Sequence, residues 1–279
     1  MLTQNTIKKI EDFISVEPRS VNEIATHIIK NWRTADRYIR EIEESLGSVT
    51  TKVFRKGTRG ALKIVYPTSI DKISSTAFQE KMEKQILLGR EKEDFSAFDI
   101  YQHVPEKLKQ TQVEYKVHEG QTDLAHIVEL LKNTKKELLM FSGNLSFINL
   151  KDKNHELFKV IEELVKKGIK IKIACRVDIA GKENVEKMLS LNFKHAKENI
   201  EIRHTQTPLR AIIFDKKILS IKEIKEPTGK INELNKKIFL FYTIKDKSWV
   251  DWSTRIFNKI FHSSIDANKR LTEINRLNL

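Results

Sequence analysis

The fold of the first quarter of the chain is decided by residues 20–47, SVNEIATHIIKNWRTADRYIREIEESLG. Ser20, followed three residues later by Glu23, forms a capping box, in which the Ser side chain accepts a backbone N–H and the Glu reaches back. This pattern predicts the start of a short helix. A tight break at residues 30–31 separates it from a longer helix, predicted over residues 32–46. Two helices joined by such a break are typical of a helix-turn-helix.

The short helix is predicted to run through Ile24, Ala25, Ile28 and Ile29. In the longer helix, Ala35, Tyr38 or Ile39, Ile42 and Leu46 recur at helical spacing, which predicts that they face inward. Gly47 follows at the position where a left-handed residue commonly ends a helix.

Both flanks of this stretch complete a winged helix, predicted over residues 1–68. Upstream, residues 2–15 form an amphipathic helix that Pro18 terminates, with Ile7, Ile10, Phe13 and Ile14 on one face. Downstream, residues 49–54 and 61–66 are typical of strands. Residues 55–60 between them contain two glycines and three cations, which predicts a basic hairpin loop.

The predicted helix 32–46 and the basic loop 55–60 are the elements that would dock on duplex DNA, in the major groove and on phosphates. Arg33, Thr34 and Arg37 occupy the first two turns, where base edges are normally read, and Arg40 is better placed for a phosphate. Asp36 is predicted to face outward, to orient an arginine or to accept from cytosine. The full predicted DNA-binding set is Asn31, Trp32, Arg33, Thr34, Asp36, Arg37, Arg40, Arg55, Lys56, Thr58 and Arg59. The alternative is a protein-interaction module with solvated arginines.

Residues 69–117 are predicted to connect two domains. Phe78, Met82, Ile86 and Leu87 recur on one helical face between charged residues. This helix would either pair two chains into a homodimer, as two DNA half-sites require, or pack on its own chain. Both alternatives stay open from the sequence.

Residues 118–279 alternate between helical and strand patterns, which predicts an α/β domain with a partly parallel sheet. The chain as a whole is therefore predicted to be a multi-domain α/β protein. Predicted helices cover residues 122–132, 154–167 and 183–191, and an aromatic helix with Trp249, Trp252 and Phe257, expected to be core, ends the series. Predicted strands cover residues 137–142, 169–175, 200–203, 209–214, 218–221 and 238–244.

Several of these motifs resemble a known family. The stretch from Ser20 to Ile39 is similar to the helix-turn-helix of archaeal and bacterial winged-helix regulators. Three features resemble the phospholipase D-like domain of TrmB-type archaeal regulators: the strand before Ser142-Gly-Asn, the helix-to-strand run 162–173, and residues 208–215, PLRAIIFD. The resemblance implies a DNA-binding regulator with a degenerate phospholipase D-like domain.

Active phospholipase D enzymes carry the motif His-x-Lys-x-x-x-x-Asp, with a His nucleophile and a Lys that clamps phosphate. In this chain Pro208 occupies the His position, Arg210 the Lys position and Asp215 the Asp position. Because proline cannot act as a nucleophile, no catalytic residue is predicted, and the resemblance implies a domain for ligand sensing or oligomerisation.

A ligand pocket in this domain is predicted beyond the carboxyl ends of the strands. Its candidate residues, for a small-molecule effector, are Ser142, Asn144, Arg176, Asp178 and Arg210. Each of them has a structural alternative as a turn, cap or solvated strand-end residue.

The net charge of +13 favours a polyanionic partner, although a generally lysine-rich surface would produce the same charge. Cys175 is the only cysteine, so no internal disulfide forms, which fits a reducing cytoplasm. The eight histidines lack zinc-site spacing, and no glycine-rich phosphate loop occurs, so neither a metal nor a cofactor is predicted. No apolar run reaches about eighteen residues, which predicts no membrane partner.

The sequence therefore predicts a cytoplasmic, nucleoid-associated transcription regulator, dimeric, that contacts double-stranded DNA through residues 32–46 and 55–60. The alternative is an architectural, chromatin-like protein that coats DNA with little sequence preference. A phosphodiesterase targeted by its winged helix is disfavoured by Pro208.

Overall fold

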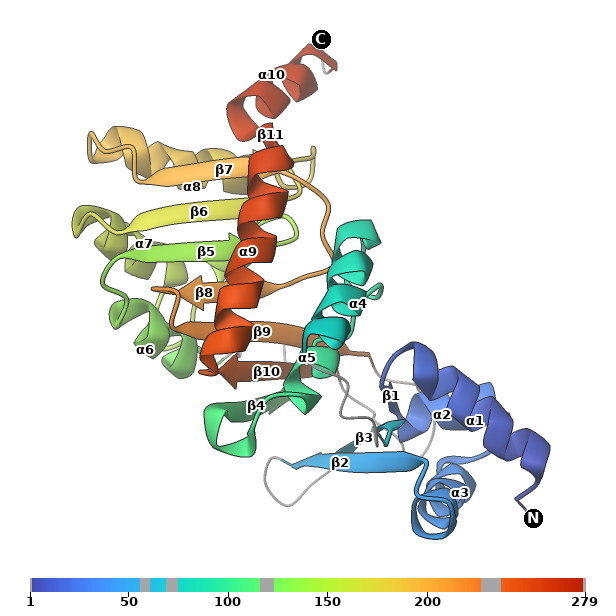
Figure 1. The fold of residues 1–279 in the computed structure, drawn as a ribbon. Coiled ribbons are helices and arrows are strands. Elements are labelled where there is room, and N and C mark those ends of the chain that lie inside the picture. The colour runs from blue at the N-terminus through green and yellow to red at the C-terminus, as the bar shows by residue number, and fades with distance from the viewer. Residues whose placement is uncertain (1, 56–60, 69–74, 116–122, 227–236, 278–279) are drawn as a thin grey trace. The chain divides into compact units, whose positions relative to one another are not determined.

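A computed structural model describes residues 2–55, 61–68, 75–115, 123–226 and 237–277 (Figure 1). The chain divides into two compact units, and each is assembled from separate segments. The first contains Met1–Phe78, Thr111–Val117 and Glu223–Leu240, and the second contains Gln79–Gln110, His118–Lys222 and Phe241–Leu279.

The first unit begins with a winged helix. Its elements in chain order are α1 (Gln4–Val16), β1 (Arg19–Ser20), α2 (Val21–His27), α3 (Trp32–Ser45), β2 (Val49–Arg55) and β3 (Ala61–Pro67). The strands form an antiparallel sheet in the order β1-β3-β2. The predicted helix-turn-helix and its hairpin are therefore confirmed, while the two-residue strand β1 was too short to leave a sequence pattern.

Local sequence explains how these helices begin and end. The capping box of Ser20 and Glu23 is present at α2. Asn31 caps α3, where its Oδ1 accepts the backbone N–H of Thr34 at 2.8 Å. Gly47 has a φ of +64°, the left-handed conformation that glycine adopts most readily at a helix end. The predicted core is confirmed in its main part, since Ile24, Ile39 and Ile42, like their neighbours Ile10 and Ile14, are fully buried.

The predicted extent of one helix and one predicted core position are wrong. The short helix does not continue through Ile29, because α2 ends at His27 and Ile29, 87% exposed, turns the chain with a φ of +55°. Leu46 is 53% exposed, because it lies at the C-cap of α3, where the chain leaves the core. In both cases the apolar spacing continues past the end of the helix, because periodicity does not mark the residue at which a helix ends.

The segment between the two predicted domains is more structured than a connector. It forms α4 (Ser75–Leu88), α5 (Phe98–Gln102), a 3₁₀ turn (Glu106–Leu108) and the unpredicted strand β4 (Lys109–Tyr115). Met82 and Ile86 of α4 are buried within this chain, whereas Leu87 is 40% exposed. These contacts favour a helix packed on its own chain, and dimerisation through this helix stays a prediction.

The larger sheet has eight strands in the order β11-β7-β6-β5-β8-β9-β10-β4. Its other strands are β5 (Glu137–Phe141), β6 (Lys170–Cys175), β7 (Ile200–His204), β8 (Ala211–Phe214), β9 (Ile218–Lys225), β10 (Ile238–Ile244) and β11 (Ile265–Asp266). The strands β5, β6 and β7 run parallel, and β8 pairs antiparallel with β5 and β9. The predicted partly parallel sheet is confirmed.

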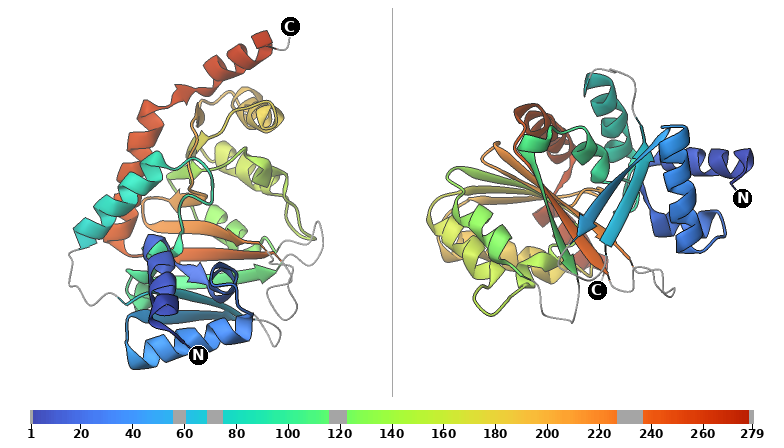
Figure 2. Two further views of the ribbon diagram at one scale, coloured as in Figure 1. Left: turned by 90° about the vertical axis from the view of Figure 1, so that its right-hand side faces the viewer. Right: turned by 90° about the horizontal axis from the view of Figure 1, so that it is seen from below.

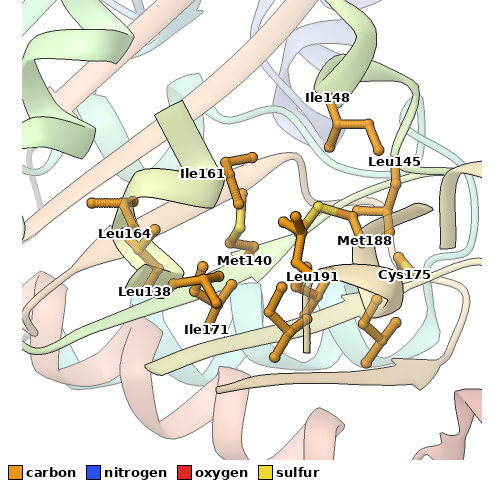
Figure 3. Close-up of a cluster of buried hydrophobic side chains, with 14 of the residues drawn as sticks. Leu138, Met140, Leu145, Ile148, Ile161, Leu164, Ile171, Cys175, Met188 and Leu191 are labelled. Carbon is orange, nitrogen blue, oxygen red and sulfur yellow. The ribbon is translucent and has the colours of Figure 1, made fainter. Parts of the chain in front are cut away.

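Helices cover both faces of this sheet in the second unit (Figures 1 and 2). One face carries α6 (Ala125–Lys132), α7 (Leu157–Lys166) and α8 (Lys182–Lys194), and the other carries α9 (Lys247–Ser263). Alternate residues of β5 serve the two faces: Leu138 and Met140 belong to the cluster with α6 to α8, and Phe141 contacts Phe257 of α9. Figure 3 shows this cluster. The final helix α10 (Ala267–Leu277) adds Leu271 to it.

Candidate nucleic-acid interface and a polar cluster at the sheet edge

The exposed side of α3 gathers the arginines that the sequence singles out. Arg33, Arg37 and Arg40 are exposed, while Ala35, Tyr38 and Ile39 on the opposite side are buried. Among the described residues, a hollow of about 590 Å³ follows this exposed side, lined by Trp32, Arg33, Asp36, Arg37, Arg40, Glu41 and Glu44. The winged helix therefore presents three guanidinium groups along one helix.

The predicted outward orientation of Asp36 is wrong, whereas its predicted pairing with a neighbouring arginine is confirmed. Asp36 is 5% exposed, and its two oxygens are engaged by Arg40 Nη2 at 2.7 Å and by Lys63 Nζ at 2.9 Å. Asp36 is buried because Lys63 reaches over to it from β3, a pairing that local sequence spacing does not reveal, whereas Arg40 lies one turn along the same helix. Asp36 therefore has no free oxygen aimed at a base.

The beginning and the end of α3 differ in charge. The first turns carry Arg33 and Arg37, whereas the last turns carry the exposed Glu41 and Glu44. Carboxylates repel phosphate, so only the first half of α3 suits the surface of a duplex. Asn31 is engaged as the helix cap, and Trp32 packs partly against the core of the winged helix.

The predicted hairpin-loop contacts fall outside the described part of the chain. These are the side chain of Arg55 together with Lys56, Thr58 and Arg59. The two strands that the loop joins are described and pair in register from Val49 with Pro67 to Arg55 with Ala61.

The predicted ligand residues of the second unit meet at the carboxyl edge of the parallel strands. Ser142 follows β5, Arg176 follows β6, and Arg210 precedes the antiparallel β8. Because Phe141 pairs with Ala174 on one side and with Ala211 on the other, these positions are neighbours across the sheet. Asn144 and Asp178 lie close to each other on either side of Gly181. A Cβ on this glycine would stand 3.0 Å from Asn144 Cβ and 3.2 Å from Asp178 Oδ1.

Arg210 lies against the backbone of Gly143. A Cβ at Gly143 would come within 3.2 Å of Arg210 Nε, so the missing side chain makes room for the guanidinium. Arg210 Nη1 donates to the carbonyl oxygens of Thr207 at 2.7 Å and Leu209 at 2.8 Å. Burial, and then the nearby Arg176, lower the pKa of Arg210 below its usual value. Because its charged form is disfavoured by burial and by Arg176, the guanidinium of Arg210 would be stabilised by a nearby anion.

Arg176 and Asp178 at this edge are already engaged by other groups of the protein. Arg176 Nε lies 2.8 Å from Asp178 Oδ2, and Glu91 lies 3.9 Å from Arg176 Nη1. Asp178 Oδ1 also accepts the backbone N–H of Gly181 at 2.8 Å. Glu91 was missed by sequence reasoning, because it stands within no recognisable pattern, and Gly143 was recognised as part of the Ser142-Gly-Asn motif but not as the residue that makes room for Arg210.

The motif positions lie at both ends of β8. Pro208 is buried, and a Cβ at Gly89 would meet its Cγ at 2.9 Å, so the two residues pack closely. Asp215 lies at the opposite end of β8. His204 Nδ1 accepts the backbone N–H of Val177 at 2.9 Å, and burial lowers the pKa of this histidine.

Cys175, at the end of β6, is fully buried. Burial raises the pKa of its thiol to about 12, which leaves almost no thiolate at neutral pH. Within the described ranges, no group of three or more His, Cys, Asp or Glu side chains could hold a metal ion. None of the described helices is both long and apolar enough to cross a membrane.

No protein-family model matches the chain, and no curated protein matches its sequence. Solved structures are similar at low identity. Nuc from Salmonella typhimurium, a phospholipase D family member, shares 12% identity over 57% of this chain and 97% of its own, with a TM-score of 0.40. TrmBL2, an archaeal chromatin protein with a novel mode of DNA binding, shares 15% over 95% of this chain and 94% of its own, with a TM-score of 0.39. NucT from Helicobacter pylori shares 12% over 57% of this chain and 99% of its own, with a TM-score of 0.39.

Proposed function

We propose that this protein binds duplex DNA through the first two turns of α3, mainly at the phosphate backbone. The observation that carries the proposal is the exposed row of Arg33, Arg37 and Arg40 on the recognition helix of a winged helix. Arginine suits this role, because its planar guanidinium stays charged and forms paired hydrogen bonds to phosphate or guanine.

The chemistry of α3 supports binding with little sequence preference over binding to one operator. Adenine is read best by Asn or Gln, and α3 contains neither. Asp36, the residue suited to cytosine, is buried in ion pairs with Arg40 and Lys63. What remains exposed in the first two turns is cationic, and cations bind every sequence through phosphates. TrmBL2 is described as a chromatin protein; for this chain, an architectural role rests on the chemistry of α3.

The double variant R33A/R37A tests the proposal. We expect affinity for a duplex to fall at least tenfold near 0.1 M salt, and the salt slope of log K to shrink by about 1.8, because two phosphate contacts are lost. Fluorescence anisotropy with a labelled duplex at several salt concentrations measures both quantities. The matched control R255A/R276A removes two exposed arginines from the second unit and leaves α3 intact. Equal binding by R33A/R37A and the wild type would refute the proposal.

The preference among sequences separates the architectural protein from the transcription regulator. A regulator binds its operator roughly 10³-fold or more tightly than random DNA. We expect the best duplex selected from a random pool to bind this protein less than about a hundredfold more tightly than the pool average. Occupancy of a few promoters in the cell, with a ratio above 10³, would establish the regulator instead.

We also propose that the carboxyl edge around Arg210 binds an anionic effector without cleaving it. The observation in favour is the guanidinium seated on Gly143 beside Arg176, with a proline, Pro208, at the position where the active motif has its histidine. The wild type is expected to leave bis(p-nitrophenyl) phosphate intact and to melt at a higher temperature with 20 mM phosphate than with 20 mM chloride. In R210M this rise in melting temperature with phosphate, which we call the phosphate shift, should disappear. Phosphodiester cleavage that R210M abolishes, or a phosphate shift that R210M retains, would contradict this proposal.

A further inference from the structure

A second cationic surface lies at the opposite edge of the large sheet, where β5 and β6 begin (Figure 1). Two lysines precede β5, one opens β6, and two form the turn between β8 and β9. All five side chains are exposed. We call this the amino-edge surface, and its members are Lys135, Lys136, Lys170, Lys216 and Lys217.

Backbone contacts hold these loops together. The backbone N–H of Lys170 donates to the carbonyl oxygen of Lys136 at 3.0 Å, which joins the starts of β5 and β6. Asp215 accepts the backbone N–H groups of Lys135, Lys136 and Glu137 at 2.7–3.0 Å, which joins the β8–β9 turn to the same place. Burial works to raise the pKa of Asp215, but these hydrogen bonds lower it overall. The backbone of the lysine-bearing loops is therefore held side by side along this edge.

The charge of this edge is not neutralised locally. Lys216 pairs with Glu137 at 2.7 Å, and the ionised Asp215, whose oxygens accept backbone N–H groups, interacts electrostatically with Lys217, so the five lysines exceed the two carboxylates among them. The other four lysines form no ion pair within the part of the chain that the structure describes. None of the five lies within a helix, so none of them serves as the cation of a helix C-terminus.

The turn that carries two of these lysines is conformationally costly. Asp215 and Lys216 have φ values of +50° and +54°, and the backbone N–H of Lys217 donates to the carbonyl oxygen of Phe214. Three residues, 215–217, join the paired Phe214 and Ile218, and a left-handed conformation costs a residue with a side chain, such as Lys216, about 1 kcal/mol or more. Strained positions gather at functional sites, where the surrounding structure maintains them.

The spacing of the amino-edge surface matches a DNA backbone. Strands β6, β5, β8 and β9 are consecutive neighbours, so three spacings of about 4.8 Å give a width of about 14 Å. Duplex DNA carries one phosphate charge per about 1.7 Å of helix axis, counted over both strands, so a surface of this width faces more than one phosphate. We propose that the amino-edge surface is a second, sequence-independent contact for the phosphate backbone of duplex DNA. The inference takes its partner from the proposed function and adds a contact outside the winged helix.

The experiment uses the full-length triple variant K135Q/K170Q/K217Q and the control K107Q/K153Q/K269Q, which removes three exposed lysines elsewhere in the second unit. We expect the salt slope of log K for a long duplex to shrink by up to about 2.7 in the first variant and by clearly less in the control. Circular dichroism and thermal melting establish that both variants fold. Equal slopes for both triples would overturn the inference, because overall charge would then explain binding.

Combination with the α3 variant separates this inference from the proposed function. In the R33A/R37A background, the amino-edge triple should weaken the residual duplex binding further, and the control triple should not. If R33A/R37A alone has no effect while the amino-edge triple weakens binding, the proposed function fails and the inference stands. If the amino-edge triple instead weakens binding only to phosphatidylserine vesicles or to double-stranded RNA, the DNA assignment is overturned.

Discussion

Replacement of Phe257 by alanine is expected to lower the free energy of unfolding of the second unit by about 3–5 kcal/mol. The side chain is fully buried on the face of the sheet that α9 covers. Its ring meets Phe141 of β5 edge to face, with centroids 5.1 Å apart, and stacks on Phe261 at 5.2 Å. Alanine removes this packing and leaves a cavity that a helix pinned against a sheet fills poorly. Urea unfolding followed by tryptophan fluorescence measures the change.

The same variant tests the role of the aromatic helix. Trp249 and Trp252 are each 3% exposed, so the prediction that the α9 aromatic residues belong to the core rather than to a base-stacking platform is confirmed. Phe193 of α8 provides the control, because it is 88% exposed, and F193A should change stability by less than about 0.5 kcal/mol. A loss below about 1 kcal/mol for F257A, or weaker DNA binding by a stable F257A, would contradict this role.

The parts of the fold that the sequence predicted are those that depend on local signals. Ser20 and Glu23 locate the start of α2, and Gly47 locates the end of α3, because caps act over three or four residues. The alternation of helices and strands likewise predicted the parallel order of β5 and β6, since a crossover helix imposes it.

The parts that the sequence did not predict depend on distant partners. Strand β4 begins in KQTQ, a polar run without alternation, and becomes a strand at the edge of the large sheet. Asp36 looked like an outward residue of α3 until Lys63, which is 27 residues away, paired with it. At the candidate sites, the arginines of α3 could be predicted from helical spacing, whereas Glu91 beside Arg176 could not.

Replacement of Lys225 by methionine is expected to destabilise the first unit by about 3 kcal/mol at pH 7. The lysine, 15% exposed at the end of β9, lies 3.1 Å from Glu223 Oε1 and 3.9 Å from Glu23 Oε2. Although burial works to lower the pKa of Lys225, the surrounding carboxylates raise it, so the ammonium is charged at neutral pH. Methionine fills a similar volume but leaves the carboxylates without their cation in a partly buried place.

The pH dependence distinguishes this charge effect from a packing effect. Burial works to raise the pKa of Glu23, but Lys225 and the Ser20 hydrogen bonds lower it overall, so its contribution to stability is present at neutral pH and is lost as the pH falls through its folded pKa. Burial raises the pKa of Glu17, although Arg19 and Lys225 act to lower it. This carboxyl therefore protonates at a higher pH than Glu23 does. Lys225 loses these partners as first Glu17 and then Glu23 protonates, so the deficit of K225M should be smaller at pH 4 than at pH 7 and should shrink further below pH 4.

The exposed Lys9 of α1 provides the matched control, because K9M makes the same substitution in the same unit. Its effect should stay below about 0.5 kcal/mol at both pH values. Urea unfolding followed by circular dichroism, with hydrogen exchange of the α2 amides, locates any loss in the winged helix. A deficit of K225M that is equal at pH 7 and pH 4 would mean that the aliphatic stem, rather than the charge, stabilises this unit. Since Glu23 also caps α2, the helix before the recognition helix, loss of the Lys225 charge should loosen the helix-turn-helix first.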